Sequence, residues 1–187
     1  WWPGPDPAIT AYMNRSIDLL EELARETGNR INMNRRGYAF ASADRGKIAW
    51  LAEMAGRAAH HGAGEVRLHE RDSASYRPAG EVGFDEKLDG VDLITDAGLI
   101  RRHFSYLSGD TCVVAHARRA GWLSAQQLGM TMLDAARACG VRMLRGKLDA
   151  IDTVAGKLQR VHVARNDGGR ETIDTAHLVL ACGPRLK

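Results

Sequence analysis

The sequence predicts an α/β protein, and three features carry that prediction. Leu178–Ala181 is an apolar run without alternation that ends at a Gly-Pro pair, which is typical of a parallel strand buried on both faces. The helical pattern of Ser124–Cys139 leads directly into Val141–Leu144, as in a helix-to-strand step of an α/β unit. Three short strand-like runs lie between these segments. We therefore expect parallel strands plus an antiparallel meander.

The predicted parallel strand ends at Cys182-Gly183. Open parallel sheets bind ligands at the carboxyl ends of their strands, and glycine lets main chain approach a ligand closely. A core strand followed by an ordinary glycine turn explains the same residues equally well.

The first third of the chain predicts a helix, a strand and a second helix. Asp6 and Pro7 have the residue types of an N-cap and a first helical position, and Gly28 is typical of a helix end. Apolar residues recur between them at helical spacing: Ile9, Met13, Ile17, Leu20 and Ala24. Alternation predicts a strand over 37–41, and periodicity predicts a helix over 44–61. The apolar stripe of that second helix is Ile48, Leu51, Ala55 and Ala58.

A polar stretch over 65–92, broken by proline and glycine, predicts a long surface connection with short strands. A short helix is expected over 96–106 and a strand over 111–117. Ser124 and Gln127 form a capping box for the helix that follows. The expected buried face of that helix is Leu128, Met132, Ala135, Ala136 and Cys139.

Turn residues separate the three strand-like runs of the predicted meander. The runs are Leu148–Asp152, Leu158–Val163 and Arg170–Ile173. Both intervening turns contain glycine in hairpin-type sequences. Within the middle run, His162 is expected to face solvent.

Composition limits the classes of function. The 187 residues are 44% hydrophobic and 26% charged, with a formal net charge of +3, and the arginines are scattered, which argues against a nucleic-acid partner. No apolar run is long enough to span a bilayer, and no signal peptide is present. Cys112, Cys139 and Cys182 form no CxxC pair, so we expect free, buried thiols and a reducing, cytoplasmic compartment.

Two further patterns resemble a metal site and a dinucleotide-binding site but lack residues that such sites require. His60, His61 and His69 lack a carboxylate or cysteine at metal-ligand spacing, so we expect no metal. Gly62-Ala63-Gly64 imitates a dinucleotide fingerprint, but Arg67 stands where the third glycine is required and a helix precedes it.

Several diffuse patterns, taken in order, resemble the D-amino-acid oxidase family of FAD-dependent oxidoreductases, which includes glycine and sarcosine oxidases. Ser16–Glu26 and Gly37-Tyr38 resemble the family's helix and first substrate-domain strand. Ala120–Ser124, Ala136–Val141 and Leu178–Pro184 resemble segments of the second half of its flavin-binding domain. The resemblance covers nearly the whole chain.

The resemblance implies part of an FAD-binding Rossmann-like domain, with parallel strands plus a β-meander, and part of an α+β substrate domain. Residues 1–34 would be a helix bordering the FAD domain, 35–118 a substrate-domain portion, and 119–187 the second half of the FAD domain. The family's glycine-rich loop would precede Trp1 and its C-terminal part would follow Lys187, so we expect a central fragment. Gly183-Pro184-Arg185 replaces the family's frequent Gly-Ala-Trp, which leaves the subfamily open.

The same resemblance implies four cofactor-binding residues. Leu148 matches a position whose main chain meets the adenine, and Ala181, Cys182 and Gly183 match a strand end that passes close to FAD. A purely structural role for Leu148 and Ala181 remains the alternative. Three tryptophans have two possible roles, a position near the flavin or substrate or simple packing: Trp1, Trp2 and Trp122.

The function implied by the resemblance is oxidation of a C–N bond in an amine or amino acid, with hydride transfer to FAD. No catalytic residue is assigned. A substrate carboxylate would need a cation, for which Arg35, Arg36, Arg118 and Arg119 are available, although a solvated surface role is expected for each. The alternatives are a non-catalytic FAD-stabilised binding or assembly protein of the same fold, and a nucleotide-independent α/β binding module.

Overall fold

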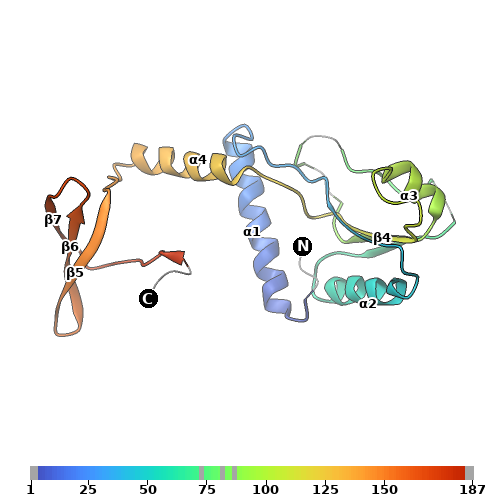
Figure 1. The fold of residues 1–187 in the computed structure, drawn as a ribbon, viewed down its shortest axis with the longest axis horizontal. Helices are drawn as coiled ribbons and strands as arrows, with labels where there is room; N and C mark the ends of the chain where they lie inside the picture. The colour runs from blue at the N-terminus through green and yellow to red at the C-terminus, as the bar shows by residue number, and fades with distance from the viewer. Residues whose placement is uncertain (1–3, 72–73, 81–82, 86–87, 184–187) are drawn as a thin grey trace. The chain divides into compact units, whose positions relative to one another are not determined.

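The chain has a mixed α/β fold that divides into two compact units, Trp1–Asp134 and Ala135–Lys187. A computed structural model describes residues 4–71, 74–80, 83–85 and 88–183 (Figure 1). The α/β class agrees with the sequence prediction. Each unit is described by itself below.

The first unit contains a four-stranded mixed sheet in the order β1-β4-β3-β2. Its strands are β1 (Tyr38–Ser42), β2 (Val66–His69), β3 (Val91–Ile94) and β4 (Val113–Ala117). β4 is antiparallel to β1 and β3, whereas β2 is parallel to β3. Every residue of the two central strands, β3 and β4, is buried.

Helices cover both faces of this sheet, with α2 (Lys47–His60) and α3 (Ala97–His103) on opposite sides (Figure 1). Side chains alternate along a strand, so β3 and β4 supply two different surfaces. The surface toward α2 is apolar and consists of Val91, Leu93, Val113, Ala115 and Ala117. The opposite surface packs Ile94 and Val114 against α3 and Tyr76. That second surface also carries charged residues.

Helix α1 (Pro7–Glu26) begins and ends as the sequence predicts. The Asp6 side chain accepts a hydrogen bond from the Ala8 amide at 2.9 Å, and Gly28 has a φ of +61°. Ala24 on α1 packs in a small core with Ile31, Met33 and Phe84.

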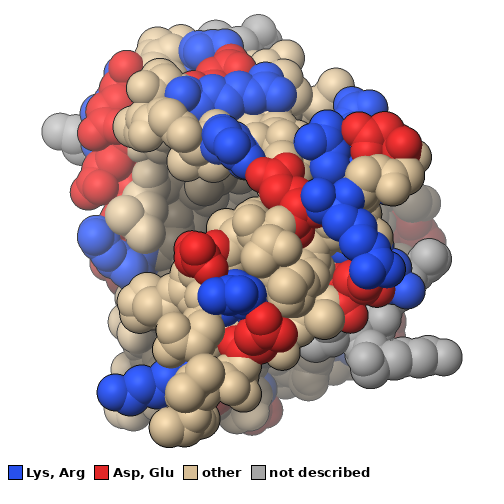
Figure 2. All heavy atoms as spheres, turned by 90° about the vertical axis from the view of Figure 1, so that its left-hand side faces the viewer, with Lys and Arg blue, Asp and Glu red and all other residues tan. Residues whose placement is uncertain are grey.

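The second unit is built around an antiparallel meander, which confirms that prediction. Helix α4 (Ala125–Ala138) crosses the boundary between the units and leads to the meander. The strands, in sheet order, are β5 (Gly146–Val154), β6 (Lys157–Arg165) and β7 (Arg170–Asp174). Figure 2 shows positive and negative side chains interspersed on one face of the molecule rather than gathered by sign.

The structure does not contain the two parallel strands predicted from the sequence. Val141–Leu144 and Leu178–Ala181 lie outside every strand, and the exposed fractions of Val179 and Leu180 are 87% and 51%. A strand needs main-chain partners on a neighbouring strand. Among the described residues no strand pairs with either segment, so the apolar runs remain extended and exposed.

Three further expectations are also corrected. The predicted buried face of α4 is largely exposed, since Met132 is 60% exposed and only Leu128 packs against the core around Ala24. Cys139 and Cys182 are exposed rather than buried. The stretch expected to be a surface connection ends in the buried central strand β3, which the sequence analysis missed.

Candidate functional site

A row of buried polar side chains crosses the α3 side of the sheet. Strand register places Arg67 beside Asp92, and Asp92 beside His116. Asp92 and His116 are 3% and 4% exposed. Buried charges are costly unless they are paired, so the contacts of these residues decide what the row can do.

The carboxylate of Asp92 is fully engaged by donors. Its Oδ1 accepts from Arg67 Nε at 2.6 Å and lies 3.0 Å from His69 Nε2, and its Oδ2 lies 3.2 Å from Arg118 Nη1. Burial alone would raise the pKa of Asp92, but hydrogen bonds from Arg67 and His69, with the charges of Arg67 and Arg118, outweigh burial and lower it. Asp92 is therefore ionised and holds the three donors in place.

His116 is held as a neutral imidazole. Its Nε2 lies 2.9 Å from the carbonyl oxygen of Arg36, which can only accept, so Nε2 carries the proton. Its Nδ1 is then the acceptor, 3.0 Å from the Tyr76 hydroxyl and 3.2 Å from Arg118 Nη1. Burial lowers the pKa of His116, against the bond to Arg36, and the charge of Arg118 lowers it further.

Tyr76 connects this network to a cavity. Burial raises the pKa of the Tyr76 phenol to about 12, so the hydroxyl keeps its proton. The ring is 6% exposed, and the Arg118 guanidinium lies 5.8 Å from its centroid. Tyr76 and His116 line the cavity, whereas Arg118 and Asp92 do not belong to its described lining.

The cavity has a volume of about 480 Å³, and five aromatic or imidazole side chains belong to its described lining. Its described lining is Arg36, Gly37, Ala39, Tyr76, Pro78, Ala79, Gly80, His103, Phe104, Tyr106 and His116. Tyr76 packs against His103 at a ring-centroid distance of 5.0 Å, and Phe104 packs against His116 at 5.7 Å. No carboxylate belongs to the described lining. This cavity, called the ring cavity below, combines flat apolar walls with a tyrosine hydroxyl and a neutral histidine.

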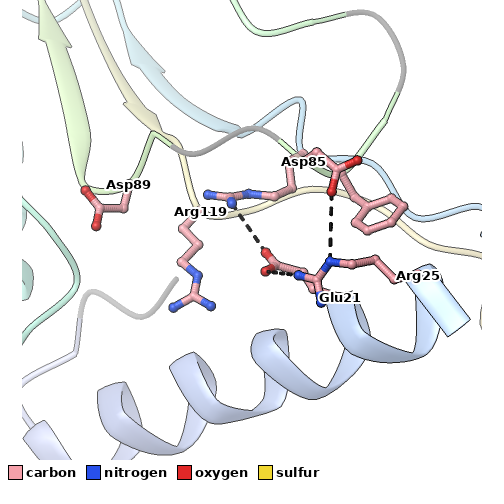
Figure 3. A pocket seen from close by; sticks show the side chains of 7 residues that line it. Glu21, Arg25, Asp85, Asp89 and Arg119 are labelled. Carbon is pink, nitrogen blue, oxygen red and sulfur yellow. Dashed lines mark hydrogen bonds and ion pairs between the residues drawn. The ribbon is translucent and has the colours of Figure 1, made fainter.

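A second cavity, of about 370 Å³, differs because its charges pair with one another (Figure 3). Arg35 lies 3.3 Å from Glu21, and Arg25 lies 3.6 Å from Glu21 and 4.0 Å from Asp85. These pairs tie α1 to the segment around Asp85. We interpret this cavity as a structural ion-pair cluster, since Glu21 and Asp85 are already engaged by Arg25 and Arg35.

The predicted surface role is wrong for two of the four arginines that could bind a substrate carboxylate. Arg118 and Arg35 are 1% and 8% exposed, because Asp92 and Glu21 compensate their charges inside the first unit. Arg36 is exposed and lines the ring cavity. Arg119 binds Asp18 on α1.

The four predicted FAD-contacting residues all lie in the second unit. Leu148 is partly buried in β5 beside a register shift, where the pairing passes from Leu148–Val163 to Ala150–His162. Asp149 between them has no directly paired residue, and such bulges leave main chain unpaired. Ala181, Cys182 and Gly183 are exposed.

Gly183 is exposed and follows a segment that is not a strand, so the enclosed strand end expected from the sequence is not found in the described part of the chain. Gly183 has a φ of +65°, and a Cβ built on it would meet no atom within 4 Å among the described residues. The main chain at Gly183 is therefore open, and a register shift lies beside Leu148. Of the three tryptophans considered for a place near the flavin or substrate, Trp122 is 58% exposed, and Trp1 and Trp2 lie outside the described residues.

The buried polar row was missed by sequence reasoning. The available signal was a single ionisable residue inside each apolar run, Asp92 within Val91–Ile94 and His116 within Val113–Ala117. An ionisable residue in a fully buried strand needs partners from neighbouring strands. That requirement could have linked the two runs.

Searches for related proteins and for other site types add two findings. No family model, curated protein or solved structure matches the chain. Within the described ranges, no group of three or more histidine, cysteine or acidic residues is arranged to hold a metal ion, and no helix has the length and apolarity to cross a membrane.

Proposed function

We propose that the chain is part of an FAD-dependent oxidoreductase that oxidises a C–N bond of an amine or amino acid. The observation that carries the proposal is the order of the structural elements that lead into and make up the second unit. Helix α4 is followed by the extended segment 141–145, the meander β5–β7 and the extended segment 175–182. This order supports the resemblance drawn from the sequence.

The two extended segments have the composition of parallel strands in a Rossmann-like sheet. Val141, Met143, Leu178 and Val179 are apolar yet exposed, with exposed fractions from 39% to 87%. Exposed apolar residues in a row mark a surface that is normally covered. In the proposed FAD-binding domain, further strands would pair with both segments and cover them.

Main chain at Leu148 and at 181–183 would hold the nucleotide in this proposal. The bulge beside Leu148 and the open main chain at Gly183 leave room for such contacts. When bound, FAD would accept a hydride from the carbon beside the substrate nitrogen, so the protein's task is to position the flavin and to exclude water. A small-molecule substrate and a cytoplasmic location belong to the same proposal.

An anaerobic titration of the FAD-loaded full-length protein with amines and amino acids tests the activity. We expect at least one compound to bleach the visible absorption of the oxidised flavin. Binding of FAD without bleaching by any of them would instead favour the non-catalytic FAD-stabilised protein. Failure to bind FAD would contradict both.

A further inference from the structure

A serine, a histidine and an aspartate of the first unit are joined by hydrogen bonds on the α3 side of its sheet. Ser75 Oγ lies 2.7 Å from His69 Nδ1, and His69 Nε2 lies 3.0 Å from Asp92 Oδ1. His69 ends β2, Asp92 lies on the adjacent parallel strand β3, and Ser75 comes from the segment that follows β2. The imidazole of His69 therefore connects the hydroxyl of Ser75 to the carboxylate of Asp92.

The two ring nitrogens of His69 have opposite roles in this arrangement. The ionised carboxylate of Asp92 can only accept a hydrogen bond, so Nε2 of His69 donates to it. In the neutral imidazole, Nδ1 then carries the lone pair and accepts from the Ser75 hydroxyl. The Tyr76 ring packs edge-on against the imidazole at a ring-centroid distance of 5.6 Å, which fixes the orientation of a side chain that is only 3% exposed. His69 is therefore placed to take a proton from Ser75.

The serine end of this arrangement lies at the surface. Ser75 is exposed and belongs to the lining of a cavity of about 570 Å³, whereas His69 and Asp92 are buried. The described lining also includes Leu68, Glu70 and Arg71. Leu68 is 55% exposed and supplies an apolar contact surface, and the guanidinium of Arg71 supplies hydrogen-bond donors. A small molecule in this cavity can therefore reach the serine while the imidazole stays shielded from water.

A hydroxyl bonded to a base, which a carboxylate orients in turn, is an arrangement that activates serine for acyl transfer. It is recognised by geometry and roles rather than by the order of the residues in the chain. We infer that Ser75 is the nucleophile of an esterase site, with His69 as its general base and Asp92 as a positioning residue. This inference does not depend on the flavin proposal.

The substrates expected for this site are carboxylic esters. Ser75 Oγ forms a bond to the carbonyl carbon, and its proton passes to His69 Nδ1 and then to the alcohol that leaves as the ester C–O bond breaks. Water attacks the acyl-serine in the same way, which releases the acid and restores the Ser75 hydroxyl. Arg71 of the same lining supplies donors for the charge that develops on the carbonyl oxygen.

Diisopropyl fluorophosphate tests the nucleophile in the full-length protein. Attack by the Ser75 oxygen forms a P–O bond and releases fluoride, so peptide mass measurement should find the diisopropylphosphoryl group on Ser75 of the folded protein. Protein unfolded in urea should not react, because its Ser75 hydroxyl has lost contact with His69. No adduct on Ser75, or equal labelling of the folded and unfolded protein, would overturn the inference.

Hydrolysis of para-nitrophenyl acetate tests turnover at the same site. Ser75→Ala should lower kcat/KM by about a hundred-fold or more, because it removes the nucleophile together with the proton that His69 accepts. Since Ser75 is exposed, this variant should still fold, which urea unfolding checks. The control Ser108→Ala should leave kcat/KM unchanged, because Ser108 is also exposed but donates to Asp110 rather than to an imidazole. Equal kcat/KM in the wild type and in Ser75→Ala would contradict the assignment.

Discussion

Gly37 lies directly against the imidazole of His116. A Cβ built on Gly37 would stand 1.9 Å from His116 Nε2 and 2.7 Å from the Ala117 carbonyl oxygen. The absence of a side chain at residue 37 therefore lets His116 reach the carbonyl oxygen of Arg36. This contact links a glycine at the start of β1 to the polar row that crosses the sheet.

Gly37→Ala should be strongly destabilising. The φ of +88° at Gly37 disfavours alanine by about 1–2 kcal/mol. The clash of the added Cβ with His116 and β4 increases that cost. Urea unfolding of the full chain measures the loss. Gly28→Ala is the matched control, because its φ is +61° but no atom lies within 4 Å of the added Cβ. A loss in Gly37→Ala no greater than in the control would contradict the packing described here.

Removing the charge of Asp92 should cost about 3–5 kcal/mol of unfolding free energy. Asp92→Asn leaves the buried guanidinium of Arg118 without its carboxylate, and Arg67 with only Glu65 as an acidic partner. Adding Arg118→Met removes one of the uncompensated charges. The double variant should therefore lose less than the sum of the two single losses, as measured in a double-mutant cycle of urea unfolding. Additive losses would show that the two residues do not interact.

Stability should fall on mild acidification. The pKa of His116 is lowered from 6.5 in the folded protein, so below pH 6.5 the unfolded chain takes up a proton that the folded chain does not. The unfolding free energy is therefore highest above pH 6.5 and decreases as the pH drops below it. The lowered pKa of His103 acts in the same direction.

Urea unfolding at pH 7.5, 6.0 and 5.0, values chosen about the ordinary histidine pKa, checks this dependence. His116→Gln should reduce the slope, whereas substitution of the exposed His177 by Gln should leave it unchanged. Identical slopes in the wild type and in His116→Gln would contradict the buried, neutral state of His116.

Elements with local signals were predictable from the sequence. Helix α1 was found because Asp6, Pro7 and Gly28 define its ends within the chain itself. The meander was found because its turns carry residues suited to hairpins, and Ala155 and Gly156 indeed have φ values of +50° and +76°. These signals act over a few residues and need no distant partner.

Elements that depend on distant partners were not predictable. Leu178–Ala181 has the composition of a buried strand, but no described strand pairs with it. β3 was missed for the opposite reason: the charge of Asp92 indicates a surface, whereas Arg67, His69 and Arg118 make its burial possible. The polar row and the ring cavity bring together residues from 36 to 118, and nothing in the spacing of these residues specifies their contacts.

The most direct test of the proposed function is the uptake of FAD by the full-length protein. After incubation with excess FAD and removal of unbound cofactor, absorption spectra and mass measurement of the released cofactor should show about one FAD per chain. Gly183→Val should lower FAD affinity by about ten-fold, because a branched side chain would cover main chain that the proposal places against FAD. Gly168→Val is the matched control, since Gly168 has a φ of +86°, is equally open and lies in the β6–β7 turn. A protein that retains no flavin, or equal FAD affinity in the two variants, would contradict the proposed flavin site.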